Sequence, residues 1–231
     1  MILFVDNEHS SGYDASYGEM ILAARSRITY RLQDMTGEIC LLQRYHDVSP
    51  KLIQRFDIKA MFISGNGSDA EVYDPQLQEG LRSVIRAGSV PIFGFCGGHQ
   101  LIAETFGVPI ERIGKIPEGE EDPNPEYAPG WVTESGYRPV SLDRRAAIDH
   151  PLLAGLAEEP VVRHAHAWEI KSLPRGFVNL GGTDMTPIQI MADVERMIVG
   201  TQFHPEYWTD ENPAGEQLIR NFCSMAGLLG E

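Results

Sequence analysis

The first hundred residues alternate between short apolar runs and longer segments whose apolar positions recur at helical spacing. The apolar runs occupy residues 1–5, 38–42, 59–64 and 90–95, and each has the length of a buried strand. Strands that alternate with helices form parallel sheets, because each crossover helix returns the chain to the same end of the sheet. The pattern therefore predicts an α/β fold: an open, mostly parallel twisted sheet with helices on both faces.

Start and stop signals support the helices between these runs. Ser49-Pro50 and Asp74-Pro75 each place an N-cap residue before a proline, and Gly88 suits a C-terminal stop. Further helices are expected from Gln100 to Phe106 and after Asn212-Pro213. Two helices show apolar stripes at helical spacing, one with Met20, Ile21, Ala24, Ile28, Leu32 and Met35, and one with Leu77, Leu81, Val84 and Ile85.

The second half of the chain has shorter strand-like pieces and an unusual insertion. Residues 116–130 hold five acidic residues and four prolines, a composition that favours a loop. We found no linker, so residues 1–231 are expected to form a single domain. The short connections indicate mixed or antiparallel strands, around residues 137–142, 160–164, 177–180, 187–191 and 197–203.

Charge and composition exclude several classes of function. The chain has 231 residues and a net charge of -14, which repels phosphate backbones and argues against nucleic acid as a partner. No apolar run is long enough to span a membrane, and the N-terminus lacks the basic region of a signal peptide. The cysteines, Cys40, Cys96 and Cys223, are far apart and odd in number. Reduced thiols and a cytoplasmic location are therefore expected.

One cysteine lies where catalytic nucleophiles are found. Cys96 follows the apolar run 90–95 and precedes Gly97-Gly98-His99-Gln100. A nucleophile between a strand and a helix sits on a sharp elbow, which small neighbours make possible. The helix N-terminus favours a thiolate, and the N–H of the next residue can point at an oxyanion. A purely structural turn would look the same in this segment alone.

A second segment, Gln202-Phe203-His204-Pro205-Glu206, supplies the groups that a cysteine nucleophile needs. His204 can act as a base, and a carboxylate fixes the tautomer of such a base. Positions two apart in an extended segment lie on one side, so Glu206 can reach the far nitrogen of His204. By itself the tripeptide is also compatible with an ordinary surface loop.

The two segments together resemble the class I, triad-type glutamine amidotransferase family. In that family a G-x-C-x-G-x-Q elbow carries the nucleophile and a late H-P-E carries the base and its orienting carboxylate. The pattern is similar to the glutaminase domains of GMP synthetase and of anthranilate and aminodeoxychorismate synthases. The resemblance extends over most of the chain, through Asp6-Asn7, the turn Ser64-Gly65-Asn66-Gly67-Ser68, residues 149–156 and residues 164–168.

The resemblance implies a flavodoxin-like fold, an activity and a set of site residues. Cys96, His204 and Glu206 would form a triad that hydrolyses the side-chain amide of L-glutamine through a thioester, and no cofactor is expected. Only 25 residues follow Glu206, so the ammonia is expected to pass to a separate synthase subunit. The resemblance places backbone oxyanion donors at Gly97, Gly65 and Asn66, and glutamine contacts at Gln100, Ala165 and His166.

Two departures from the family pattern concern the oxyanion turns. The residue after the nucleophile is Gly97 and not a larger apolar residue, and the usual S-G-G-P turn reads Ser64-Gly65-Asn66-Gly67. Extra glycine and the loss of proline are expected to loosen both turns. We therefore expect a site that depends on a partner for full order.

Two other functions and one metal site were weighed against the glutaminase. A stand-alone hydrolase of γ-glutamyl amides or conjugates would use the same triad, and a non-enzymatic binding module would keep only the fold. His164 and His166 share a face of a strand and could bind a metal ion. Because no third ligand is evident in the sequence, no metal site is predicted.

Overall fold

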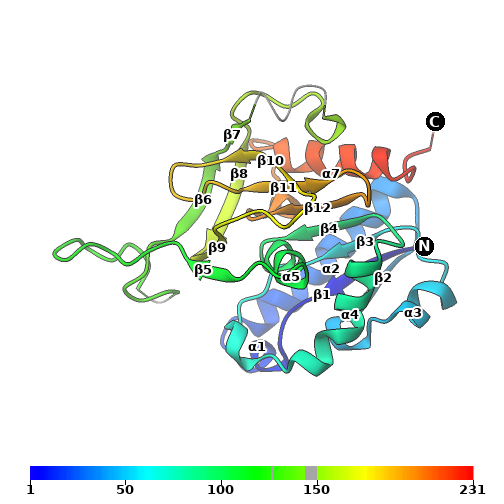
Figure 1. Ribbon diagram of the computed structural model, residues 1–231, viewed down its shortest axis with the longest axis horizontal. Helices are drawn as coiled ribbons and strands as arrows, with labels where there is room; N and C mark the ends of the chain where they lie inside the picture. The colour runs from blue at the N-terminus through cyan, green and yellow to red at the C-terminus, as the bar shows by residue number, and fades with distance from the viewer. Residues whose placement is uncertain (126, 144–149, 231) are drawn as a thin grey trace.

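The computed structural model describes residues 1–125, 127–143 and 150–230. Its centre is an eight-stranded sheet with helices on both faces (Figure 1). The first five strands across the sheet run parallel and the last three join antiparallel, as the alternation and the shorter second-half strands predict. The order is β2 (Cys40–Arg44), β1 (Ile2–Asp6), β3 (Met61–Ile63), β4 (Ile92–Phe95), β12 (Ile198–Thr201), β11 (Ile190–Asp193), β10 (Val178–Gly182) and β7 (Ser141–Leu142).

Two apolar cores lie on the two faces of this sheet. Successive side chains of a strand point to opposite faces, so Phe4 of β1 enters one core and Leu3 enters the other. The first core contains residues of α2 (Gly18–Thr36) and α7 (Ala214–Met225). The second contains residues of α3 (Pro50–Arg55), α4 (Pro75–Ala87) and α5 (Gly97–Thr105).

The helix boundaries follow the predicted caps. The side chain of Ser49 accepts a hydrogen bond from the backbone N–H of Leu52, and that of Asp74 accepts one from Gln76. Gly88 adopts the left-handed conformation at φ 54°, as a helix C-cap requires. The helix α5 begins at Gly97, three residues before the predicted start, because Cys96 itself makes the turn out of β4.

Some predicted apolar positions are wrong. Leu77 is 50% exposed and Met20 is 68% exposed. In α4 the buried stripe runs through Gln78, Leu81 and Ile85, at the i, i+3 and i+7 spacing of one helix face. That stripe turns Leu77 toward solvent. The apolar Leu77 therefore lies outside the buried face, whereas the polar Gln78 lies within it.

Two small antiparallel sheets project from the main one (Figure 1). They pair β5 (Ile110–Arg112) with β9 (Trp168–Ile170), and β6 (Glu134–Pro139) with β8 (Val161–His166). The sequence did not predict β5 or the short helix α1 (Ser10–Asp14). The segment 116–130 has no helix or strand among its described residues, as its composition predicts.

The structure also bears on the 149–156 segment and on the length and polarity of the helices. Asp149, which begins the 149–156 segment, lies outside the described residues, whereas Pro151–Leu153 form a single 3-10 turn capped by His150. Every helix in the described part of the chain is too short or too polar to cross a lipid bilayer.

Candidate active site

Cys96 occupies a strained turn at the carboxyl end of β4. Its backbone lies at φ 47° and ψ -103°, a region that costs a residue with a side chain about 1–3 kcal/mol. Such strain is held only where the surrounding structure imposes it, and it is common at functional sites. The position, outside the carboxyl end of a central parallel strand, is where open α/β sheets bind ligands.

Glycines on both sides of Cys96 let the helix α5 approach the sheet closely. A Cβ atom at Gly94 would lie 2.6 Å from the carbonyl carbon of Gly98. A Cβ atom at Gly98 would lie 2.4 Å from the carbonyl oxygen of Ile63, on β3. Any larger residue at either position would push α5 away from β3 and β4. The glycines of the elbow are therefore required by packing as well as by the turn.

His204 and Glu206 lie beside Cys96 because β12 is the parallel neighbour of β4. His204 Nδ1 is 2.8 Å from Glu206 Oε1, and Glu206 is fully buried. Burial lowers the pKa of His204, but the charges of Glu206 and Cys96 outweigh it and hold this pKa well above its ordinary value. The imidazole therefore keeps a proton more firmly than an exposed histidine does.

The turn after β3 contacts the same pair of residues. A Cβ atom at Gly65 would lie 2.7 Å from His204 Cε1 and 3.3 Å from Cys96 Cβ. Only glycine leaves room there for the imidazole and the thiol to stand side by side. The turn brings the backbone at Gly65 to the edge of the Cys96 thiol and the His204 imidazole.

Buried charges hold this turn, and of these only Asp6 was singled out in the sequence. Arg25 donates to the carbonyl of Gly65 at 2.8 Å and pairs with Asp6 at 2.7 Å. Glu8 accepts hydrogen bonds from the backbone N–H groups of Gly67, at 2.6 Å, and Ser68, at 3.1 Å. The signal in the sequence was the pair of acidic residues Asp6 and Glu8 at the end of an apolar strand. A carboxylate buried there is costly unless it is paired or hydrogen-bonded.

The space beside Gly97 is occupied by a side chain of the turn after β3. A Cβ atom at Gly97 would lie 1.7 Å from Asn66 Oδ1, so the asparagine side chain fills the space that a larger residue 97 would take. Asn66 Nδ2 in turn donates to the carbonyl of Ser68 at 2.7 Å. The two departures from the family pattern therefore fit each other and leave no gap in the elbow.

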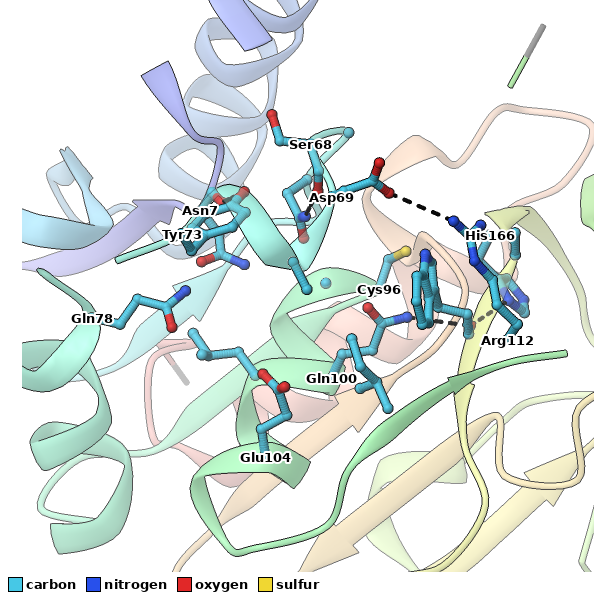
Figure 2. A pocket seen from close by; sticks show the side chains of 18 of the residues that line it. Asn7, Ser68, Asp69, Tyr73, Gln78, Cys96, Gln100, Glu104, Arg112 and His166 are labelled. Carbon is cyan, nitrogen blue, oxygen red and sulfur yellow. Dashed lines mark hydrogen bonds and ion pairs between the residues drawn. The ribbon is translucent and has the colours of Figure 1, made fainter. Parts of the chain in front are cut away.

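A pocket of about 210 Å³ opens beside the Cys96 thiol (Figure 2). Gln100 and His166 line it, together with Asn66 and Gly97. Gln100 Nε2 is held by the carbonyl of Trp168 and by Gln202 Oε1, each at 3.2 Å. Ala165 is not among the lining residues, but its carbonyl oxygen lies 3.9 Å from Cys96 Sγ.

The mouth of the pocket carries Trp168, from the 164–168 segment, together with Asp69, Arg112 and Tyr127, to which no role was assigned from the sequence. Figure 2 shows Asp69 and Arg112 reaching toward each other from opposite sides, with Arg112 Nη2 3.7 Å from Asp69 Oδ1. The Arg112 guanidinium lies 4.0 Å from the ring centre of Trp168. Tyr127, from the acidic segment, donates to the carbonyl of Ala165 at 3.2 Å. These residues lie far apart in the sequence, and no common motif links the segments that carry them.

Behind the pocket wall, the histidine pair of β8 has a third neighbour. Glu134 of β6 lies opposite His166 in the strand register, and Glu134 Oε2 is 3.0 Å from His166 Nε2 and 3.8 Å from His164 Nδ1. This third ligand is not evident in the sequence because Glu134 is thirty residues away from His164 in the chain. Only the pairing of β6 with β8 brings it to the histidines.

Comparison with protein families gives one match that covers most of the chain. Residues 27–226 match the family model of the class I glutamine amidotransferases. The matched range includes the elbow at Cys96 and the His204–Glu206 segment.

Two curated relatives are both named as GMP synthases, but one is a long single chain and the other is a separate subunit. The chain is 29% identical over 192 residues to a glutamine-hydrolysing GMP synthase of Symbiobacterium thermophilum, covering 82% of this chain and 31% of that one. It is 30% identical over 175 residues to a protein of Methanococcus aeolicus that is named as one subunit of a glutamine-hydrolysing GMP synthase, covering 76% of this chain and 78% of that one. The chain therefore spans about a third of the longer relative and most of the separate subunit.

Solved structures show the same fold. A crystal structure from Thermoplasma acidophilum has a TM-score of 0.68 at 20% identity and covers 98% of this chain and 94% of that one. A glutamine amidotransferase from Methylobacillus flagellatus has a TM-score of 0.63 at 17% identity and covers 97% and 74% of the two chains.

Proposed function

Because the chain belongs to the class I glutamine amidotransferase family, we propose that it is a glutamine-hydrolysing subunit that supplies ammonia to a synthase, with Cys96, His204 and Glu206 as its catalytic triad. The observation that carries the proposal is the convergence of these three residues at the carboxyl edge of β4 and β12, beside a pocket. A nucleophile, a base and an orienting carboxylate in that order are the parts that acyl transfer requires.

The proposed reaction has two halves that share one histidine. The Cys96 sulfur attacks the side-chain amide carbon of glutamine, and His204 passes a proton to the departing nitrogen, which leaves as ammonia. The resulting thioester is then attacked by water, from which His204 takes a proton. Glutamate leaves and the thiol is restored. Glu206 keeps His204 in the correct orientation and stabilises its charged form.

Backbone N–H groups are proposed to stabilise the oxyanion formed in each half. The donors would be Gly97, the first residue of α5, and Asn66 with Gly65 in the turn after β3. The Asn66 nitrogen lies 3.1 Å from the position that a Cβ atom of Gly97 would take, so the two segments border one small space. Donors fixed by packing lose little energy to rearrangement when charge develops.

The charged mouth is proposed to select free amino acids. The α-carboxylate of glutamine would pair with Arg112 and its α-ammonium with Asp69, replacing the pair that these residues make with each other. Gln100, His166 and the backbone at Ala165 would hold the rest of the substrate. Arginine suits this role because it binds carboxylates with two parallel hydrogen bonds.

The size of the pocket bears on the alternative of γ-glutamyl conjugates as substrates. Its volume of about 210 Å³ lies below the range of about 300–1,000 Å³ that is usual for sites of larger ligands. A free amino acid suits such a pocket better than a conjugate with a bulky leaving group. The space therefore favours glutamine over the alternative.

The relatives indicate the class of partner. Since the chain has most of the length of a relative that is named as a separate subunit of GMP synthase, we propose that the ammonia passes to another subunit, one with GMP synthase activity.

The test is glutamate release from glutamine by the purified chain, alone and with a GMP synthase synthetase subunit from the same genome. Intact mass spectrometry would follow a covalent glutamyl adduct, with Cys96→Ala as the control. We expect turnover and an adduct that both disappear in Cys96→Ala. Absence of turnover and of adduct in both conditions would overturn the proposed activity. Turnover that the synthetase subunit leaves unchanged, with no transfer of nitrogen, would overturn the proposed partner only.

A further inference from the structure

A buried polar cluster borders the pocket through His166 and takes no part in the bond changes of the proposed reaction. It consists of Glu134 on β6 and of His164 and His166 on β8, and each of the three is at most 2% exposed. The strand register pairs Glu134 with His166 and Gly136 with His164. Residues two apart on a strand share a face, so both imidazoles point to the side on which the carboxylate lies. We call these three residues the Glu-His-His cluster.

The spacing of the cluster suits a small metal ion. One ligand atom from each of the three residues can be chosen so that all lie within 4.8 Å of one another. Glu134 Oε2 is 3.0 Å from His166 Nε2 and 3.8 Å from His164 Nδ1. Ligand atoms around a tetrahedral zinc ion, each about 2.0–2.2 Å from the metal, are separated by roughly 3.3–3.6 Å. The two observed distances lie on either side of that range.

The hydrogen bonding of His166 calls for a positive charge between the ring and the carboxylate. His166 Nδ1 is 3.1 Å from the carbonyl oxygen of Trp168, which can only accept, so Nδ1 carries a proton. In the neutral ring, Nε2 then presents a lone pair to Glu134. Either a second proton or a metal ion must stand there. A metal-binding histidine commonly donates its other N–H to a backbone carbonyl in this manner.

His164 separates these two possibilities. Within the described residues neither of its ring nitrogens has a hydrogen-bond partner, although the side chain is fully buried. A second proton on His166 would balance Glu134 but would leave His164 unused. Buried polar groups without partners are rare, and an ion is one of their ordinary explanations.

Two further hydrogen bonds hold the Glu134 carboxylate in place. Glu134 Oε1 accepts a hydrogen bond from Thr183 at 2.6 Å, and Glu134 Oε2 accepts one from Gln189 Nε2 at 2.5 Å. Such contacts fix the orientation of a metal-binding group. The cluster therefore has both the ligands of a metal site and the second layer of contacts that holds them.

We propose that Glu134, His164 and His166 bind one divalent transition-metal ion of the zinc class. Two imidazoles and one carboxylate form a ligand set that zinc, cobalt and nickel accept. The ion would tie β6 to β8, the strand that carries Ala165 and His166 to the pocket wall. The metal is a structural element in this proposal: it makes and breaks no bond of the substrate, but it would fix His166, which also lines the pocket.

The test must distinguish this cluster from the catalytic cysteine, which can also bind zinc or cobalt. Chelator-treated Cys96→Ser protein is titrated with Co²⁺ and followed by visible absorption and by metal analysis. We expect one Co²⁺ per chain, with ligand-field bands, without a thiolate charge-transfer band, and with displacement by Zn²⁺. X-ray absorption of the zinc-loaded protein should show imidazole nitrogen and oxygen neighbours and no sulfur.

Three variants in the Cys96→Ser background locate the ion. Glu134→Gln and His164→Leu each remove one ligand and should weaken Co²⁺ binding by at least about 100-fold, whereas the matched control His46→Ala removes an exposed imidazole and should change nothing. Circular dichroism checks that each variant is folded. Failure of Cys96→Ser protein to bind Co²⁺ would overturn the proposal without any cluster variant. Binding that survives both Glu134→Gln and His164→Leu, or a metal with sulfur neighbours, would overturn it as well.

Discussion

The two sides of the pocket beside Cys96 are constructed differently. On the side of β3, β4 and α5, glycines at positions 65, 94, 97 and 98 allow backbone and side chains to approach to distances that a Cβ atom would prevent. On the opposite side, the loop after β12 and the strands β5, β6 and β8 contribute buried or half-buried charges. The first side fixes the positions of its groups chiefly by close packing, with Arg25, Asp6 and Glu8 holding its turn from behind. The second side fixes them chiefly by paired charges.

This difference indicates how each side should respond to change. Close-packed protein leaves no room for an added methyl group, so the glycine side should be sensitive to size and insensitive to pH. Buried charges depend on their partners, so the other side should respond to neutral substitutions of the same shape. The five predictions below test this contrast, beginning with the largest effect.

The largest effect is expected from Glu206→Gln, which keeps the shape and removes the charge. The amide can no longer stabilise a charged His204, and kcat should fall by about 10³–10⁴-fold, the scale known for triad carboxylates. Burial lowers the pKa of His204 and Glu206 raises it most, so this pKa should fall in the variant. Nuclear magnetic resonance titration of the His204 Cε1–H signal measures that shift. An unchanged pKa would show that the carboxylate does not control the imidazole.

The same charge pair should make stability depend on pH. A histidine pKa that is higher in the folded state than in the unfolded state adds stability below the unfolded value, about 6.5. That contribution is lost as the pH rises through the folded pKa. The difference in unfolding free energy between the wild type and Glu206→Gln should therefore be largest below about pH 6.5 and shrink at higher pH, as measured by urea unfolding across a pH series.

The next largest effect is expected on the glycine side, from Gly65→Ala. The new methyl group would lie 2.7 Å from His204 Cε1 and must displace the imidazole. A shift of about 1 Å in a catalytic group costs about 10²-fold in rate, and kcat/KM for glutamine should fall by that factor at every pH tested. Gly67→Ala is the matched control, because a Cβ atom there comes no closer than 3.4 Å to any atom. Equal losses in both variants would contradict the steric account.

A third, smaller effect tests whether Gly97 and Asn66 fit each other. Gly97→Ala alone should lower kcat/KM by about 10–100-fold, because its methyl group would meet Asn66 Oδ1 at 1.7 Å. Asn66→Ala removes that atom, and the double variant should recover most of the loss. A double-mutant cycle measures the coupling. Independent, additive losses would mean that the two residues act separately.

The smallest effect is expected at the charged mouth. Arg112→Gln removes the cation proposed to pair with the α-carboxylate, and KM for glutamine should rise about tenfold with little change in kcat, since one charge-assisted hydrogen bond contributes about 1.5–3 kcal/mol. Lys115→Gln is the matched control, because Lys115 also lies over an aromatic ring, that of Trp131, without lining the pocket. Steady-state kinetics with both variants decide whether Arg112 contacts the substrate.

Most of the fold could be predicted because its signals are local. The caps at Ser49 and Asp74 and the turn at Gly88 depend on a few neighbouring residues, and each appears in the structure as expected. The strand β5 could not be predicted in the same way, because it pairs only with β9, more than fifty residues along the chain. Leu77 shows a similar limit, since the apolar spacing of α4 did not fix which face meets the sheet.

By itself, the sequence determined the α/β class, the family and the segments that carry Cys96, His204 and Glu206, because strand and helix periods and short motifs are encoded by adjacent residues. Only the tertiary structure decided how distant residues meet. Asn66 fills the space beside Gly97, Arg112 reaches Asp69, and Glu134 joins the histidines of β8. Each of these contacts depends on strand order and register, and cooperative packing of the whole chain sets both.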